Sequence, residues 1–183
     1  TTNGSSAYGM CADASAIATN KGTITTNGHS AYGMYINDPN SEVENWGTIT
    51  TYGQWAHGMY ADAGATATNE TRGTITTNGT YAYGMYADAG ATATNAGTIT
   101  TNGWNAYGMC AWDGSTATNN GSITTYGEVA HGMDAYGSDS EVENWGTIIT
   151  SDWGAYGMYA DAGAMATNAG TITTNGEEAN GMY

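Results

Sequence analysis

The chain has very little positive charge. Only Lys21 and Arg72 are basic among 183 residues, whereas 17 residues are Asp or Glu, and the formal net charge is −15. Nucleic acids and anionic membrane surfaces are bound largely through clusters of Lys and Arg, so this composition argues against both as partners. No apolar run approaches the ~20 residues of a membrane span. The balance suits an exported, extracellular protein in a salty medium, where like charges are screened.

Cysteine, proline and phenylalanine are also scarce, with two Cys, one Pro and no Phe. Cys11 and Cys110 occupy the same place in two repeats that lie four units apart. At ~4.8 Å per stacked strand they would be roughly 19 Å apart, beyond the ~7 Å reach of a disulfide. Tyr and Asp134 fill the same column in other repeats, so we expect both thiols to point outward. They would then be available for an intermolecular bond.

What the chain does contain is a short period. A segment reading GTITTNG, or a close variant, recurs every 24–26 residues and begins at Gly22, Gly47, Gly73, Gly97, Gly121, Gly146 and Gly170. Thr, Tyr and Ile separated by Gly and Asn favour short strands joined by turns, and no helical stripe is present. The period therefore predicts an all-β fold, a parallel β-helix (β-solenoid) with coils of about 24–25 residues. Parallel crossovers favour a right-handed coil.

A longer period lies above the coil. SEVENWGTI occurs at 41–49 and again at 140–148, which indicates that a four-coil block of 99 residues is duplicated. We interpret residues 1–183 as one repeat array of about seven and a half coils. Both ends fall in mid-unit and neither carries a distinct capping unit. We therefore expect an excerpt of a longer array, continued by further repeats or by copies of itself end to end.

Alternation of side chains predicts the core as columns. The residues expected inward are Ile24, Ile49, Ile75, Ile99, Ile123, Ile148 and Ile172, then the Met column from Met10 to Met182, then the Ala column from Ala7 to Ala179. The Gly before each Met should mark a bend that turns Met inward. Stacked Asn residues are expected to form an amide ladder, at Asn20, Asn45, Asn69, Asn95, Asn119, Asn144 and Asn168.

The pattern Asn-x-Gly-x-Ile-Thr-x-x-Gly-x-x-Ala-x-Gly-Met extends over the whole chain. It resembles the β-helical passenger repeats of bacterial autotransporters and of filamentous-haemagglutinin-type adhesins, although those families have Ile or Val where this chain has Met. The resemblance implies an exported, surface-displayed rod with a structural or adhesive role. It does not specify a target.

An outward Thr-x-Thr array offers an alternative function. The array comprises Thr23, Thr25, Thr48, Thr50, Thr74, Thr76, Thr98, Thr100, Thr171 and Thr173. Coils ~4.8 Å apart and alternate residues roughly 6.6–6.8 Å apart would form a flat lattice, similar to the ice-binding face of antifreeze solenoids. Thr is also simply a good strand former on an exposed face. Ser122 and Ile149 interrupt the array.

Two positions before the inward Ala vary from coil to coil. They place aromatic side chains at Trp55, Tyr81, Trp104 and Trp153, which we call the aromatic strip. A variable strip on a fixed scaffold is typical of a binding surface in repeat proteins, and exposed aromatic side chains suit glycans, neighbouring proteins or other cells. Neutral drift at a solvent-facing turn explains the variation equally well.

Other polar residues carry weaker signals. Asp62, Asp88 and Asp161 share one turn position that could attract Ca²⁺, but one carboxylate per turn favours a solvated face. His57 and His131 lie three coils apart, roughly 14 Å, and we expect them to be lone surface histidines. We expect no enzyme and no required cofactor. Lys21, Trp46 and Arg72 share one column, so a cation–π sandwich is a natural arrangement there.

Overall fold

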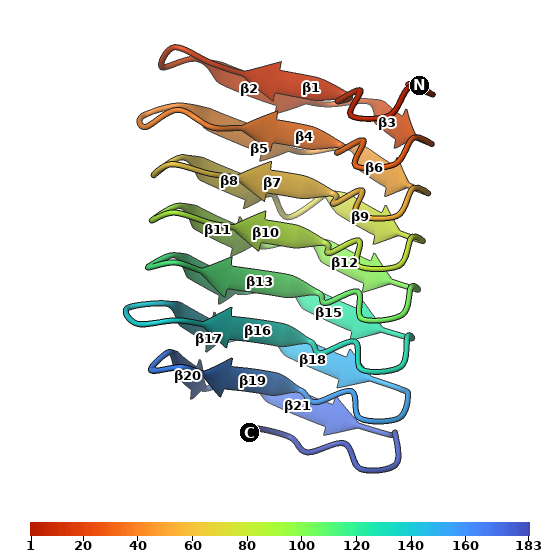
Figure 1. Cartoon of the computed structure of the whole chain (residues 1–183), viewed down its shortest axis with the longest axis vertical. Helices are drawn as coiled ribbons and strands as arrows, with labels where there is room; N and C mark the ends of the chain where they lie inside the picture. The colour runs from red at the N-terminus through yellow and green to blue at the C-terminus, as the bar shows by residue number, and fades with distance from the viewer.

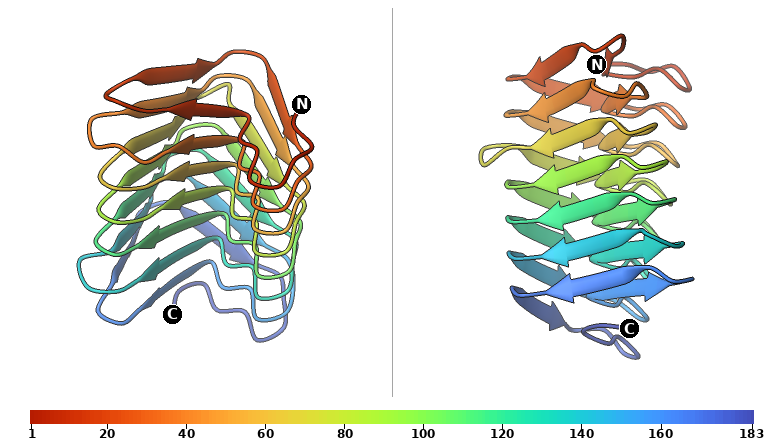
Figure 2. Two further views of the ribbon diagram at one scale, coloured as in Figure 1. Left: turned by 45° about the horizontal axis from the view of Figure 1, so that its top comes forward. Right: turned by 90° about the vertical axis from the view of Figure 1, so that its left-hand side faces the viewer.

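The computed structural model describes residues 1–183 and contains strands and turns without a helix. Each coil contributes one strand to each of three parallel seven-stranded sheets, which stack as a β-solenoid (Figure 1). Seen from the N-terminal end, the chain runs clockwise as it recedes, so the solenoid is right-handed (Figure 2). The predicted fold class is confirmed. The structure accordingly offers no helix that could span a membrane.

The three sheets are named here by their first strands. The β1 sheet contains β1 (Met10–Ala12), β4 (Met34–Ile36), β7 (Met59–Ala61), β10 (Met85–Ala87), β13 (Met109–Trp112), β16 (Met133–Tyr136) and β19 (Met158–Asp161). The β2 sheet contains β2 (Ile17–Asn20), β5 (Glu42–Asn45), β8 (Thr66–Asn69), β11 (Thr92–Asn95), β14 (Thr116–Asn119), β17 (Glu141–Asn144) and β20 (Met165–Asn168). The β3 sheet contains β3 (Thr23–Thr26), β6 (Thr48–Thr51), β9 (Thr74–Thr77), β12 (Thr98–Thr101), β15 (Ser122–Thr125), β18 (Thr147–Thr150) and β21 (Thr171–Thr174).

The core contains the predicted Ile and Met columns and two further columns, one formed by Ala87 and its counterparts and the other by Ala93 and its counterparts. Met85 pairs in register with Met59 and Met109, and Ile75 pairs with Ile99 in the β3 sheet. These five side chains are buried, as is the Ala column between Ala31 and Ala155. In-register stacking lets a sequence with few large aliphatic residues bury most of them in one continuous core. Residues of these columns are partly exposed to solvent only in the first and last coils.

Gly84 shows why a glycine precedes each core Met. A Cβ at this position would overlap Cγ2 of Ile99 and the carbonyl oxygen of Gly108 in the next coil. The chain bends here, and Met85 then points into the core. The bend also produces an inward step in the outline of each coil (Figure 2).

The Asn column forms a side-chain ladder, as predicted. Nδ2 of Asn69 donates to Oδ1 of Asn95 at 2.7 Å, and Nδ2 of Asn95 donates to Oδ1 of Asn119 at 2.8 Å. The same bond links every successive pair from Asn20 to Asn168. These residues end the strands of the β2 sheet and none has a positive φ, so their conformation is not the left-handed one that Asn tolerates in turns.

A second polar column lies inside the core and was not predicted. The last Thr of each β3-sheet strand except β21 is buried, and its hydroxyl donates to the carbonyl oxygen five residues later, as from Thr51 to Ala56 and from Thr125 to Ala130, both at 2.6 Å. The bond satisfies a hydroxyl that burial would otherwise leave without a partner. It also fixes the turn that follows the strand.

Candidate functional site

The variable pair of each coil lies in a tight turn with a fixed backbone. Its second residue always has a positive φ, whatever its side chain, at Ser6, Ser30, Trp55, Tyr81, Asn105, Val129, Gly154 and Glu178. The amide of Trp55 donates to the carbonyl oxygen of Thr80 at 3.0 Å, so the turns stack on one another. Because the backbone repeats, the side chains here can vary without changing the fold.

Three of the four residues of the aromatic strip contact one another. The rings of Trp55 and Tyr81 stack at 4.3 Å with an interplanar angle of 7°, and Trp104 meets Tyr81 edge-on at 5.0 Å. Trp55 and Trp104 are exposed, and Tyr81 is half-buried between them. The three form a continuous aromatic surface over successive coils. Exposed aromatic faces can stack against the apolar face of a sugar or against a partner's side chains.

Trp153 is not part of this surface. The intervening coil carries Glu128 and Val129 at the turn, and Trp153 forms no ring contact with the other members of the strip. It lines a separate surface pocket with His131, Tyr156 and other residues near the C-terminal end. The structure thus divides the predicted strip into a cluster of three residues and one outlier.

A larger aromatic array lies along the step in the coil. One column stacks Tyr8, Tyr32, His57, Tyr83, Tyr107, His131 and Tyr156 at centroid distances of 4.8–5.3 Å. A second column, on the outward face of the β1 sheet, packs against the first; for example, Tyr60 and Tyr86 stack at 4.8 Å. Sequence reasoning missed this array, although Tyr recurs after the inward Ala and again after Met in most coils.

The prediction that His57 and His131 are surface histidines is wrong. Both are buried, with exposed fractions of 4% and 5%, because each ring is stacked between tyrosines of the neighbouring coils. Nδ1 of His57 accepts a bond from the amide of Tyr83 at 3.0 Å, and Nδ1 of His131 accepts one from Tyr156 at 3.1 Å. Burial lowers the pKa of His57 to about 3 and the pKa of His131 to about 4.

The prediction for the cysteines is half wrong. Cys11 is exposed as expected, but Cys110 is buried. Its sulfur lies 3.7 Å from Oδ1 of Asp134 in the next coil, and Nε1 of Trp112 donates to the same oxygen at 3.4 Å. Burial raises the pKa of the Cys110 thiol, and it raises the pKa of Asp134 to about 6. Trp112 and Asp134 have no counterparts beside Cys11, where the matching residues are Asp13 and Tyr35.

The Thr array lies on the outer face of the β3 sheet in register. Thr74 and Thr98 are exposed, Thr76 is half-buried, and Oγ1 of Thr74 donates to Oγ1 of Thr48 at 3.1 Å. The phasing of this strand is therefore as predicted. Ile149 pairs with Thr124 in the same column and interrupts the hydroxyls.

The aspartates of the acidic turn bind their own backbone. Oδ1 of Asp62 accepts a bond from the amide of Ala63 at 2.7 Å, and Asp88 and Asp161 do the same with the residues that follow them. Each carboxylate therefore makes a local side-chain-to-backbone bond that occupies one of its oxygens. No three His, Cys, Asp or Glu side chains are grouped so that they could hold a metal ion.

Comparison with known families agrees with this architecture. The chain matches the family described as BigA third pectate lyase-like domain, at residues 1–73 and 54–183. The chain belongs to this family. The BigA third pectate lyase-like domain is a β-helix-type domain of bacterial surface proteins, so that part of the expectation is confirmed. The closer resemblance to autotransporters and filamentous haemagglutinins stays a prediction. No curated protein and no solved structure matches the chain.

Proposed function

We propose that this chain forms an extracellular structural rod in a bacterial surface protein and that the cluster of Trp55, Tyr81 and Trp104 makes the rod adhesive. The observation that carries the adhesive part is the contact between these three rings in successive coils. Large aromatic side chains at exposed turns have no role in the core columns, which are complete without them. The role is one of binding and not of catalysis.

A neutral glycan is the partner that this cluster suits best. Trp55 and Tyr81 each cover one face of the other, so the apolar surface consists of the outer face of Trp55 and the exposed ring edges of the cluster, including Trp104. Neither Lys21 nor Arg72 lies at a variable pair. Stacking of sugar rings on aromatic faces therefore supplies the affinity, with polar contacts at the rim.

Glycan-array binding tests this function. Wild-type chain should bind a set of neutral glycans, and Trp55→Ala/Tyr81→Ala/Trp104→Ala should lose about tenfold or more in affinity, which corresponds to ~1.4 kcal/mol. Trp153→Ala is the matched control, because it removes an equally exposed ring outside the cluster, and it should bind like wild type. Equal binding by the triple variant would remove the cluster from the account.

We also propose that the ends of the solenoid pack against those of another copy of the chain. Met182 and Asn168 are exposed in the last coil, although their counterparts in the interior coils are buried. Unpaired strand edges also favour the addition of strands. Sedimentation velocity at increasing protein concentration should show end-to-end association. A single species across the range would contradict it.

Ice binding is a second candidate, supported by one observation. The Thr pairs of β3, β6, β9 and β12 lie in register on one outer face. Thermal hysteresis and ice-crystal shaping measure this activity directly. Shaping that is lost in Thr76→Leu/Thr100→Leu would support it, and the absence of shaping at high protein concentration would eliminate it.

A further inference from the structure

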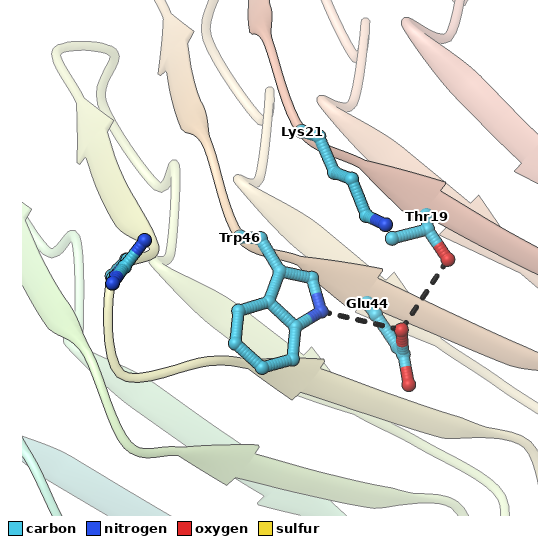
Figure 3. A pocket seen from close by; sticks show the side chains of 5 residues that line it. Thr19, Lys21, Glu44 and Trp46 are labelled. Atoms are coloured by element: carbon cyan, nitrogen blue, oxygen red, sulfur yellow. Dashed lines mark hydrogen bonds between the residues drawn. The ribbon is translucent and has the colours of Figure 1, made fainter.

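The chain's only two basic residues line the same surface pocket. Lys21 and Arg72 surround it together with Thr19, Glu44 and Trp46, and its volume is about 490 Å³ (Figure 3). This volume lies within the ~300–1,000 Å³ that is usual for pockets that bind small ligands. The pocket is formed where the β2 sheet turns into the β3 sheet, so it is separate from the aromatic cluster at Trp55.

Glu44 orients the aromatic ring of this pocket. Oε2 of Glu44 accepts one bond from the indole Nε1 of Trp46 and another from Oγ1 of Thr19, both at 3.3 Å (Figure 3). Neither Lys21 nor Arg72 forms an ion pair with an acidic residue of the chain. The pocket therefore contains two basic side chains and the Glu44 carboxylate, a net charge of +1, beside a positioned indole, in a protein with a formal net charge of −15.

An insertion brings the second basic residue to this pocket. The link between β8 and β9 has four residues, 70–73, whereas the equivalent link has two residues in every other coil. It protrudes from the stack as the yellow loop on the left of the right-hand view (Figure 2). Arg72 lies in this loop. The pocket thus spans three successive coils, about 10 Å along the rod.

The duplicated block supplies an internal comparison. Ninety-nine residues later, the chain repeats three of the five pocket residues as Thr118, Glu143 and Trp145. Lys21 is replaced there by Asn120, and the inserted loop is missing. The indole of Trp145 is 57% exposed against 39% for Trp46, and no pocket is formed around it. Both positive charges and the cavity thus occur together, in the first block alone.

We propose that this pocket binds an acidic saccharide, a sugar ring that carries a carboxylate. The apolar face of the ring stacks on Trp46, and the carboxylate pairs with Lys21, Arg72 or both. A small anion without an apolar face would gain little from Trp46 to offset the repulsion by the overall charge, which acts on any anion. A neutral sugar would leave both positive charges without a partner.

Titration calorimetry with two acidic probes and two neutral ones tests the proposal. N-acetylneuraminic acid and glucuronic acid represent the two sources of a sugar carboxylate, and galactose and glucose are the neutral counterparts. Wild-type chain should bind at least one acid more tightly than either neutral sugar, with an affinity that falls as salt rises. Lys21→Gln/Arg72→Gln and Trp46→Ala should each lose about tenfold or more.

Trp145→Ala is the matched control, because it removes the equivalent indole from the block that lacks the charges, and it should bind like wild type. Lys21 and Arg72 are exposed, so the double Gln variant should fold. It therefore still tests the proposal if Trp46→Ala fails to fold. The proposal is overturned if neither acid binds at millimolar concentration, or if the double Gln variant binds as wild type does. Trp55→Ala/Tyr81→Ala/Trp104→Ala should keep this binding, which separates this pocket from the proposed adhesive cluster.

Discussion

At the scale of single residues, the environment created by the stack decides the chemistry of each side chain. His57 and His131 stand where other coils have Tyr, and burial within the stacked column lowers the pKa of each imidazole. The unfolded chain binds protons at these sites near pH 6.5 and the native state does so only near pH 3–4. The native state is therefore stabilised above pH 6.5 and loses that contribution as the pH falls.

This difference predicts acid sensitivity that depends on two residues. The free energy of unfolding of the wild type should fall between pH 6.5 and about pH 4, by several kcal/mol at most. His57→Tyr/His131→Tyr, which restores the side chain used in neighbouring coils, should lose less over the same range. Asp134 acts in the opposite direction, because its raised pKa of about 6 makes stability fall as pH rises towards that value. Urea titrations at several pH values give the free energy of unfolding of the wild type and of the double Tyr variant. If both fall equally with decreasing pH, the two histidines are not the cause of the acid sensitivity.

Val129 tests the strain in the turn. It has φ 55°, which is unfavourable for a β-branched side chain by roughly 1–2 kcal/mol. Val129→Gly should raise the free energy of unfolding by about 0.5–1 kcal/mol. Glu128→Gly, in the same turn but without a positive φ, should lower it instead. Thermal melts of the two variants would contradict this account if both moved in the same direction.

The residue-scale errors of sequence reasoning share one cause. Alternation indicates which side chains point out of the core, but it does not indicate what covers them. The bend at Gly84 and its counterparts sets the outward face of the β1 sheet against the preceding turn, so His57 and Cys110 are outward and yet buried. The period alone contains no signal for this step, because it is a tertiary feature of the coil's cross-section.

At the scale of elements, the columns explain both the stability of the fold and its predictability. A residue type repeated at one position must tolerate its own copy above and below, which favours Ile, Met, Ala and Asn. The Ile, Met, Ala and Asn columns could therefore be predicted from the period. The buried Thr column follows from the same alternation, because Thr77 lies two residues after Ile75 and shares its face, but the partner of its hydroxyl, the carbonyl of Ala82, depends on the next turn and could not be predicted.

The Asn ladder gives the sharpest test at this scale. Asn95→Ala should lower the free energy of unfolding by roughly 1–3 kcal/mol, because the amides of Asn69 and Asn119 each lose a buried partner. Asn168→Ala is the control, since Asn168 is exposed at the end of the ladder, and it should cost less than about 0.5 kcal/mol. Chemical denaturation compares the two. If both variants lose the same free energy of unfolding, the buried bonds of the ladder contribute no more to stability than the exposed amide of Asn168.

At the scale of the whole molecule, the residues that determine the fold differ from the residues that we propose for binding. The core and the ladders are the same in nearly every coil, while the turn at the variable pair and the loop at Arg72 differ from one coil to the next. Repeat proteins commonly use such variation to build a surface without changing the scaffold. The fold could be predicted from the sequence alone, and the aromatic strip was visible as a variable pair. Its division into a cluster and an outlier, and the formation of the pocket at Trp46, depend on the structure.

Adhesion of cells that display the chain tests the central proposal most directly. The chain would be fused to a surface anchor on a non-adherent laboratory bacterium, and attachment to surfaces coated with neutral glycans would be counted under flow. We predict that wild-type chain confers attachment, that Trp153→Ala preserves it, and that Trp55→Ala/Tyr81→Ala/Trp104→Ala abolishes most of it at equal display. Attachment that is absent with the wild type, or unchanged in the triple variant, would contradict the account.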